Sequence, residues 1–77
     1  MLVGIYSFFD RVSHVYGEPF VTVNEDSAVR RFNYVMSQSP MVANDMQLFK
    51  LGELNTDTGL IAPNVEFIAN YEVKESN

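Results

Sequence analysis

Residues 2–9 are apolar or aromatic at every position except Ser7, and this run constrains the fold more than any other feature. Such a run, followed by the polar Asp10, is typical of a largely buried strand. The chain has 77 residues and no cysteine, so disulfides and thiolate-bound metals cannot stabilise it. A domain of this size buries only about 60% of the surface that its unfolded chain exposes. The core must therefore come from dense aromatic packing or from self-association, and six Phe and four Tyr are available.

A second strand is expected after a polar turn at residues 10–14. Residues 15–16 and 20–23 have the apolar and β-branched character of a strand. Gly17-Glu18-Pro19 interrupts them, and proline cannot donate a hydrogen bond to a ladder. The interruption predicts a bulge or an edge position.

A helix is predicted over about residues 25–38. Asn24 is a good N-cap, and Glu25 and Asp26 follow in the first turn, where negative charge suits the helix dipole. Ser39 precedes Pro40 and is therefore disfavoured in a helix, so the helix should end there. The apolar residues at helical spacing are Ala28, Phe32, Val35 and Met36.

The second half of the chain predicts three more strands. Residues 47–54 form the first, and the Asn-, Asp- and Gly-containing segment 55–59 is a strong turn signal. Residues 60–62 predict a short strand that stops at Pro63-Asn64, and residues 65–73 predict the last one. Residues 74–77 are expected to fray. One face of the last strand should carry Val65, Phe67, Ala69, Tyr71 and Val73, with Ile68 as an exception to the alternation.

The element order predicts an α+β fold, in which a mainly antiparallel sheet of four to five strands carries one helix on one face. We expect a single small domain over residues 1–77. One helix cannot cover both faces of such a sheet, so the second face is either solvated or paired with another subunit. Soluble monomers rarely expose large apolar patches, which favours self-association.

The charge is unevenly distributed. The net charge is −5, and residues 1–50 are close to neutral whereas residues 51–77 hold one lysine against five carboxylates. An acidic chain is repelled by nucleic acid, so only the first part could supply a basic contact face. No apolar run approaches the roughly 20 residues of a membrane span. We therefore expect a soluble intracellular protein with no membrane partner.

No pattern of catalytic or ligand-binding residues stands out. His14 is the only histidine, with Asp10 and Glu18 as its nearby carboxylates, and an exposed turn histidine is the simpler interpretation. Neither Ser7 nor Ser13 lies in a nucleophile motif, and no phosphate-binding glycine loop occurs. Segment 55–59 lacks the alternating ligands of a calcium loop. We expect no enzyme activity, no metal and no cofactor.

A small cationic and aromatic group is the candidate contact surface for nucleic acid or a partner protein. Arginine and tyrosine can contact phosphates and stack on the bases of single-stranded DNA. The alternative is a solvated helix face, in which Arg30 pairs with Asp26 four residues earlier. The candidate contact residues are Arg30, Arg31, Tyr34 and Arg11.

Several short motifs, in order and over about residues 5–61, resemble a known family. They are Ile5-Tyr6-Ser7 with Asp10, Pro19-Phe20, Asn24, Ala28-x-Arg30-x-Phe32, Asp45-x-x-Leu48-Phe49-x-Leu51-Gly52 and Thr58-Gly59-Leu60-Ile61. The chain resembles the small nonstructural protein of microviruses, the icosahedral single-stranded-DNA phages, in the gokushovirus branch. It departs from that pattern between Ser37 and Asp45, where family members often have a longer, more polar segment.

The resemblance implies a non-virion accessory protein in the cytoplasm of the infected bacterial host. Such a protein would act by binding in viral DNA replication or in packaging of the single-stranded genome. Its partners would be single-stranded DNA or the viral replication and packaging proteins. The alternative is a homo-oligomeric module that contacts host or viral proteins without binding DNA. The resemblance supplies no catalytic residues.

Overall fold

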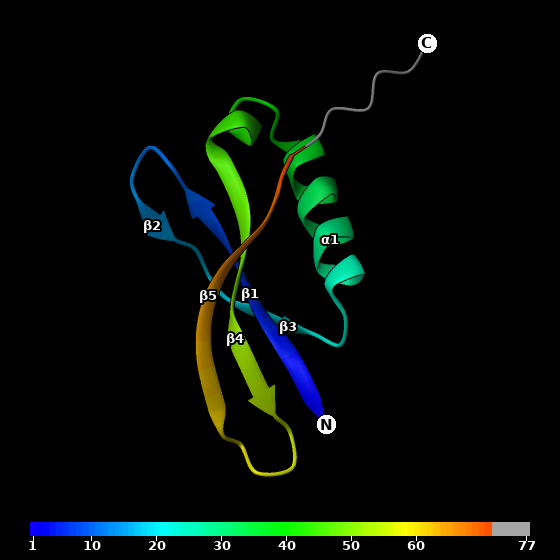
Figure 1. Cartoon of the computed structure of the whole chain (residues 1–77). Coiled ribbons are helices and arrows are strands. Elements are labelled where there is room, and N and C mark those ends of the chain that lie inside the picture. The colour runs from blue at the N-terminus through cyan, green and yellow to red at the C-terminus, as the bar shows by residue number, and fades with distance from the viewer. Residues whose placement is uncertain (72–77) are drawn as a thin grey trace.

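The N-terminal aromatic run forms the central strand of a five-stranded antiparallel sheet. The computed structural model describes residues 1–71, and Figure 1 shows their arrangement. Strand β1 (Leu2–Asp10) pairs with β4 (Met46–Asn55) on one side, and with β2 (Val15–Tyr16) and β3 (Phe20–Thr22) on the other. Strand β5 (Ile61–Asn70) pairs with β4 and forms the opposite edge. The predicted fold class, an α+β sheet with one helix on one face, is confirmed.

The predicted interruption of the second strand is also confirmed. Residues 17–19 separate β2 from β3, and both strands lie on the same side of β1. The chain stays attached across the gap, because the Gly17 N–H donates a hydrogen bond of 2.8 Å to the Phe8 carbonyl oxygen. The buried Ser7 hydroxyl donates to the Gly17 carbonyl oxygen at 2.8 Å. The edge position accommodates Pro19, which has no N–H to donate.

Helix α1 (Glu25–Gln38) has the predicted bounds and the predicted N-cap. The Asn24 side-chain oxygen accepts a hydrogen bond of 2.8 Å from the Ser27 N–H, which satisfies one of the free donors at the helix start. At the other end the Ser39 N–H donates to the Met36 carbonyl oxygen at 3.1 Å. A 3₁₀ turn, η1 (Ala43–Asp45), then leads into β4.

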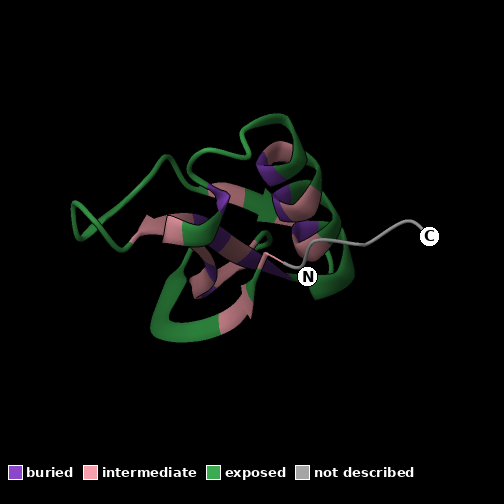
Figure 2. Cartoon of the chain, turned by 90° about the horizontal axis from the view of Figure 1, so that it is seen from above, coloured by how far each residue is buried: buried purple, intermediate pink, exposed green. Residues whose placement is uncertain are grey.

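The core lies between α1 and the sheet. Figure 2 shows the buried residues on the inner stripe of the helix and on the strands beneath it. Phe32 and Leu48 are fully buried, and the Phe32 ring meets the Phe8 ring edge-on with the centroids 5.1 Å apart. Burial of each such side chain contributes roughly 1.5–3 kcal/mol to stability. The buried residues of this core are Tyr6, Ala28, Phe32, Met36, Ala43 and Leu48.

The prediction for residues 60–73 was partly wrong. Residues 61–70 form one continuous strand that passes through Pro63, instead of two strands separated by it. Proline has no N–H to donate, and it is tolerated because the outer side of the edge strand β5 has no neighbouring strand within residues 1–71 that would accept a hydrogen bond. Ile68 is the expected exception to the alternation, and it packs against the core. The placement of Phe67 and Ala69 on one face was wrong, because the register shifts between them: Phe67 pairs with Phe49 and Ala69 with Leu48, so they lie on opposite faces. Predictions for residues 72–77 lie outside the described residues.

Gly52 is required where β4 passes β5. A Cβ built on Gly52 would collide with the carbonyl oxygen of Ala62, and its φ of 158° lies at the border of the region that favours glycine. The neighbouring main chain cannot move aside without breaking the β4–β5 ladder. The position therefore has no room for a side chain.

We predict that Gly52→Ala lowers the free energy of unfolding by about 2 kcal/mol, because the added methyl group forces the two strands apart. Gly17→Ala is the matched control, since its Cβ would lie 3.5 Å from the nearest atom, an ordinary contact. The control should change stability by less than about 0.5 kcal/mol. Urea denaturation of the three proteins measures the difference, and equal stabilities of the two variants would contradict the steric argument.

Candidate interaction surface

The sheet face that α1 does not cover is built from alternate residues of the strands. Residues that pair directly in an antiparallel ladder project from the same face. Tyr6 and Phe8 of β1 belong to the helix-side core, so Ser7 and Phe9 lie on the opposite face together with their β4 partners Phe49 and Gln47. We call this side the uncovered face.

Four aromatic rings from four strands form a continuous row across the uncovered face. The row runs from Tyr16 of β2 through Phe9 of β1 and Phe49 of β4 to Phe67 of β5. Ring centroids are 4.7 Å apart for Phe9–Tyr16, 5.5 Å for Phe9–Phe49 and 5.7 Å for Phe49–Phe67. Tyr16 is 43% exposed and Phe67 is 48% exposed at the two ends. We refer to these four residues as the aromatic row.

Aliphatic side chains extend the uncovered face toward the start of β1. Val3 and Ile5 lie on the same face as Phe9, and the ladder pairs them with residues of β3 and β4. Val3 in the middle of the sheet is only 5% exposed, whereas Val21 and Ile61 toward its edges are 52% and 61% exposed. The polar residues of the face, Ser7, Gln47 and Asn70, are uncharged. Its aliphatic residues are Val3, Ile5, Val21, Leu54 and Ile61.

The predicted contact residues lie elsewhere, and the structure does not bring all four together. Arg30 and Tyr34 are exposed and lie one turn apart on the outer side of α1. Arg31 is on the flank of the helix, where its guanidinium carbon lies 4.4 Å from the centroid of the Phe20 ring. Arg11 follows the end of β1 and donates a hydrogen bond of 2.6 Å to the Asn44 carbonyl oxygen.

Arg30 is the predicted contact cation without a protein partner in the described part of the chain. Within residues 1–71 the ion pairs join the Met1 amino group to Asp57 at 2.7 Å and Lys50 to Glu53 at 3.7 Å. The Asp26–Arg30 pair of the alternative interpretation is not formed there. Arg30 and Tyr34 together are thus the part of the candidate group that stays available for a partner.

The comparison with protein families gives a match over nearly the whole chain. A model described as Phage ORF5 protein matches residues 3–73. The chain belongs to the Phage ORF5 protein family. A search of curated proteins and a search of solved structures each gave no significant match. Family membership establishes a phage protein.

The single histidine of this Phage ORF5 family member lies in the turn between β1 and β2. His14 is exposed and has a φ of 61°, a left-handed conformation that glycine and asparagine adopt more easily. Asp10 stabilises the turn, because its side-chain oxygen accepts a hydrogen bond of 2.8 Å from the Val12 N–H. That bond lowers the pKa of the Asp10 carboxyl from its usual value.

The described residues of this Phage ORF5 protein supply neither a metal-binding group nor a membrane span. In residues 1–71 no three His, Asp or Glu side chains lie close enough to hold a metal ion. None of the helices in that range has the length and apolar character needed to cross a bilayer.

Sequence reasoning found the helix cations but did not identify the aromatic row. It treated the aromatic side chains as core filling, and for Tyr6, Phe8 and Phe32 this was right. Phe9 and Phe49 each directly follow a residue of the helix-side core, so the alternation of side chains along a strand puts them on the other face. This alternation is the sequence feature that could have identified them. The row as a whole depends on the strand order, which the sequence does not specify.

We predict that Arg31→Ala lowers the free energy of unfolding by about 0.5–1 kcal/mol, because it removes a cation–π contact with Phe20. Arg30→Ala, one residue away on the same helix, serves as the control and should change stability by less than about 0.5 kcal/mol. Chemical denaturation measures both. Equal losses would show that the guanidinium of Arg31 contributes nothing specific at this position.

Proposed function

We propose that this phage protein is a non-virion accessory protein that self-associates through its uncovered face and acts by binding in viral DNA replication or genome packaging. The observation that carries the self-association is the aromatic row, flanked by aliphatic residues with no charged side chain among them. The viral role rests on the family membership and on the resemblance to microvirus nonstructural proteins. The place of action is then the cytoplasm of the infected bacterium.

The composition of the uncovered face favours a protein partner over water. Aromatic residues are enriched and charged residues depleted at the centres of protein interfaces. Tyr16 and Phe67 leave about half of their surface in solvent at the ends of the row. A monomer would keep this apolar area hydrated, and its removal from water favours association by roughly 25 cal/mol per Å² before the costs of association.

A second copy is the partner that the chemistry of this face fits best. Each chain carries a net charge of −5, so two copies repel one another wherever their charged surfaces meet. The uncovered face has no charged side chain in its ladder pairs, and it is where that repulsion is smallest. Contact of the same face on both copies would form a two-fold dimer, the commonest arrangement of homo-oligomers. In such a dimer both helices point outward.

We predict that the protein sediments as a dimer or higher oligomer at micromolar concentration, and that the double variant Tyr16→Lys with Phe67→Lys sediments as a monomer. Both side chains lie at the exposed ends of the row, so lysine can occupy them in the monomer, whereas buried cations oppose association. Sedimentation velocity measures the mass, and circular dichroism verifies that the variant is folded.

Tyr34→Lys is the matched control, because Tyr34 is a large aromatic residue that is 66% exposed on the outer side of α1, away from the row. It should leave the oligomer intact. A wild-type protein that is strictly monomeric at high micromolar concentration would refute self-association through the uncovered face. So would an oligomer that the double variant preserves.

Direct contact with single-stranded DNA is the second candidate function, and Arg30 with Tyr34 is the observation that favours it. The two side chains lie one turn apart on the outer side of α1, where arginine can contact a phosphate and tyrosine can stack on a base. The surface is small, because Arg31 and Arg11 are engaged with Phe20 and Asn44. Affinity from the one candidate arginine that has no partner in the described part of the chain is weak and strongly dependent on salt.

We predict that Arg30→Glu with Tyr34→Ala abolishes binding of a fluorescent single-stranded oligonucleotide at low salt, because the variant loses both the phosphate contact and the stacking ring. Lys50→Gln is the control, since Lys50 already pairs with Glu53 at 3.7 Å. Fluorescence anisotropy measures the affinity. If the wild-type protein does not bind the oligonucleotide at low salt, the direct DNA contact is wrong and the self-association is unaffected.

A further inference from the structure

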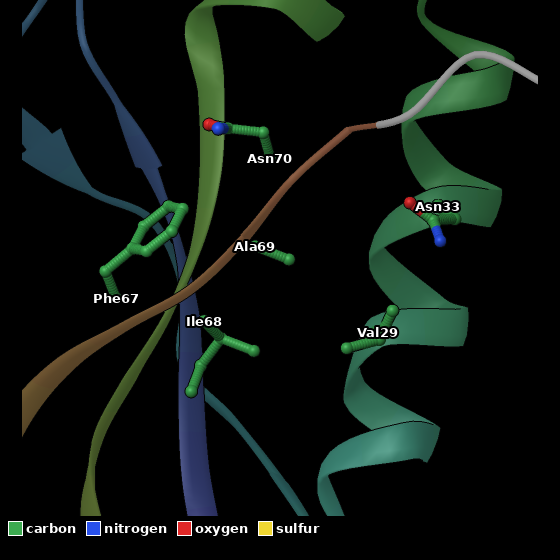
Figure 3. Close-up of a pocket in the computed structure, with 6 residues that line it drawn as sticks. All are labelled: Val29, Asn33, Phe67, Ile68, Ala69 and Asn70. Atoms are coloured by element: carbon green, nitrogen blue, oxygen red, sulfur yellow. The ribbon is translucent and has the colours of Figure 1, made fainter.

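A groove separates α1 from the last part of β5. It has a volume of about 380 Å³ and is lined by Val29 and Asn33 of the helix and by residues 67–70 of the strand. Figure 3 shows Val29 and Asn33 of the helix across the groove from Ile68 and Ala69 of β5, while the Phe67 ring and the Asn70 amide point away from the helix. The walls thus combine apolar side chains with the Asn33 amide, so a ligand that fits here carries both apolar and hydrogen-bonding groups.

The backbone of β5 is open along this groove. In residues 1–71 β5 pairs with β4 alone, so the hydrogen-bonding groups on its outer side have no strand partner. Natural sheets protect such edges with proline, charge and bulges. Pro63 protects the first part of β5, whereas residues 64–70 contain no proline and a single charge, Glu66, and their protection is limited to register shifts such as the one at Ile68. The accessible stretch of edge is therefore the one beside the groove.

Asn33 gives the groove an unmatched hydrogen-bonding group. Its side-chain oxygen is buried and has no hydrogen-bond partner within residues 1–71. The oxygen points from α1 toward β5 in Figure 3. A buried polar atom without a partner destabilises the protein, so a ligand that donates an N–H to this oxygen gains affinity from it. The main chain of an extended peptide carries such donors at regular spacing.

Two carboxylates lie just beyond one end of the groove, although neither lines it. Glu25 precedes Val29 by one helical turn, and Glu66 precedes Phe67 on β5. Burial is the largest cause that raises the pKa of the Tyr6 hydroxyl, Lys50 lowers it, and Glu25, Glu53 and Glu66 raise it further. Lys50 pairs with Glu53 at 3.7 Å and lies opposite Glu66 in the ladder, so one lysine stands against the three carboxylates and the local charge stays negative. A positively charged segment complements this end, whereas a second copy of this acidic chain does not.

We infer that the α1–β5 groove binds an extended, basic segment of a partner polypeptide, which adds as a strand to the free edge of β5. Main-chain hydrogen bonds to β5 give affinity, as in other cases of strand addition. The Asn33 oxygen accepts one further N–H, and lysine or arginine at one end meets Glu25 and Glu66. The site is separate from the aromatic row except for the Phe67 main chain, so it does not rest on self-association.

The experiment uses the full chain and three synthetic peptides of about eight residues. The first alternates lysine and valine, the second replaces lysine with glutamate, and the third is the lysine peptide with alternate main-chain nitrogens methylated. Binding is measured by fluorescence anisotropy and located by amide chemical shifts in NMR spectra. We expect the lysine peptide to bind and to shift the amides of residues 29–33 and 64–70. The other two peptides should bind at least about tenfold more weakly.

Asn33→Leu should weaken binding of the lysine peptide by about tenfold, the effect of losing one hydrogen bond to a buried acceptor. Asn44→Leu, an exposed position outside the groove, is the control and should bind as the wild type does. Three results would overturn the inference: no binding of the lysine peptide at about 1 mM, equal binding of the methylated or the glutamate peptide, or shifts confined to the aromatic row. The peptide comparison uses the wild-type chain and so does not depend on the stability of a variant.

Discussion

The contact of Phe32 with the sheet holds the two layers of this protein together. Its ring is fully buried, meets Phe8 edge-on, and is flanked along the helix by the buried Ala28 and Met36. A helix of 14 residues is about 21 Å long, whereas the longest dimension of the molecule is 46 Å. The helix can therefore cover only part of one sheet face. The rest of the sheet must be either exposed to water or covered by something other than the helix.

Strand β1 has aromatic residues on both faces of the sheet, and the helix can cover those on one face. Tyr6 and Phe8 fill the helix-side core, while Phe9 on the opposite phase joins the aromatic row. A strand with aromatic residues on both phases has two faces to bury, and α1 covers one of them. In a chain without cysteine and with a small core, a second subunit can supply the missing cover.

The sequence was informative wherever the signal was local. The Asn24 cap, the end of α1 before Pro40 and the break at residues 17–19 depend on neighbouring residues, and all three are confirmed. The structure of β5 could not be predicted in the same way. Whether Pro63 ends a strand depends on its being at an edge, and the bulge at Ile68 depends on the register with β4. The aromatic row joins four strands, so it follows from strand order and from no single motif. Arg31 differs from Arg30 because it contacts the Phe20 ring, and the position of Phe20 beside α1 follows from the tertiary structure.

The distribution of charge separates the surfaces by chemistry. The uncovered face is neutral and apolar, Glu25 and Glu66 lie just beyond one end of the α1–β5 groove, and the outer side of α1 carries Tyr34 and Arg30, which has no ion pair within residues 1–71. Burial of the neutral face between two copies leaves the groove and the outer side of each helix in solvent, because both belong to the helix side of the sheet. Self-association and partner binding therefore need not compete. A dimer would also place two copies of each partner site on one particle, which raises the effective concentration for any partner that carries the matching segment more than once.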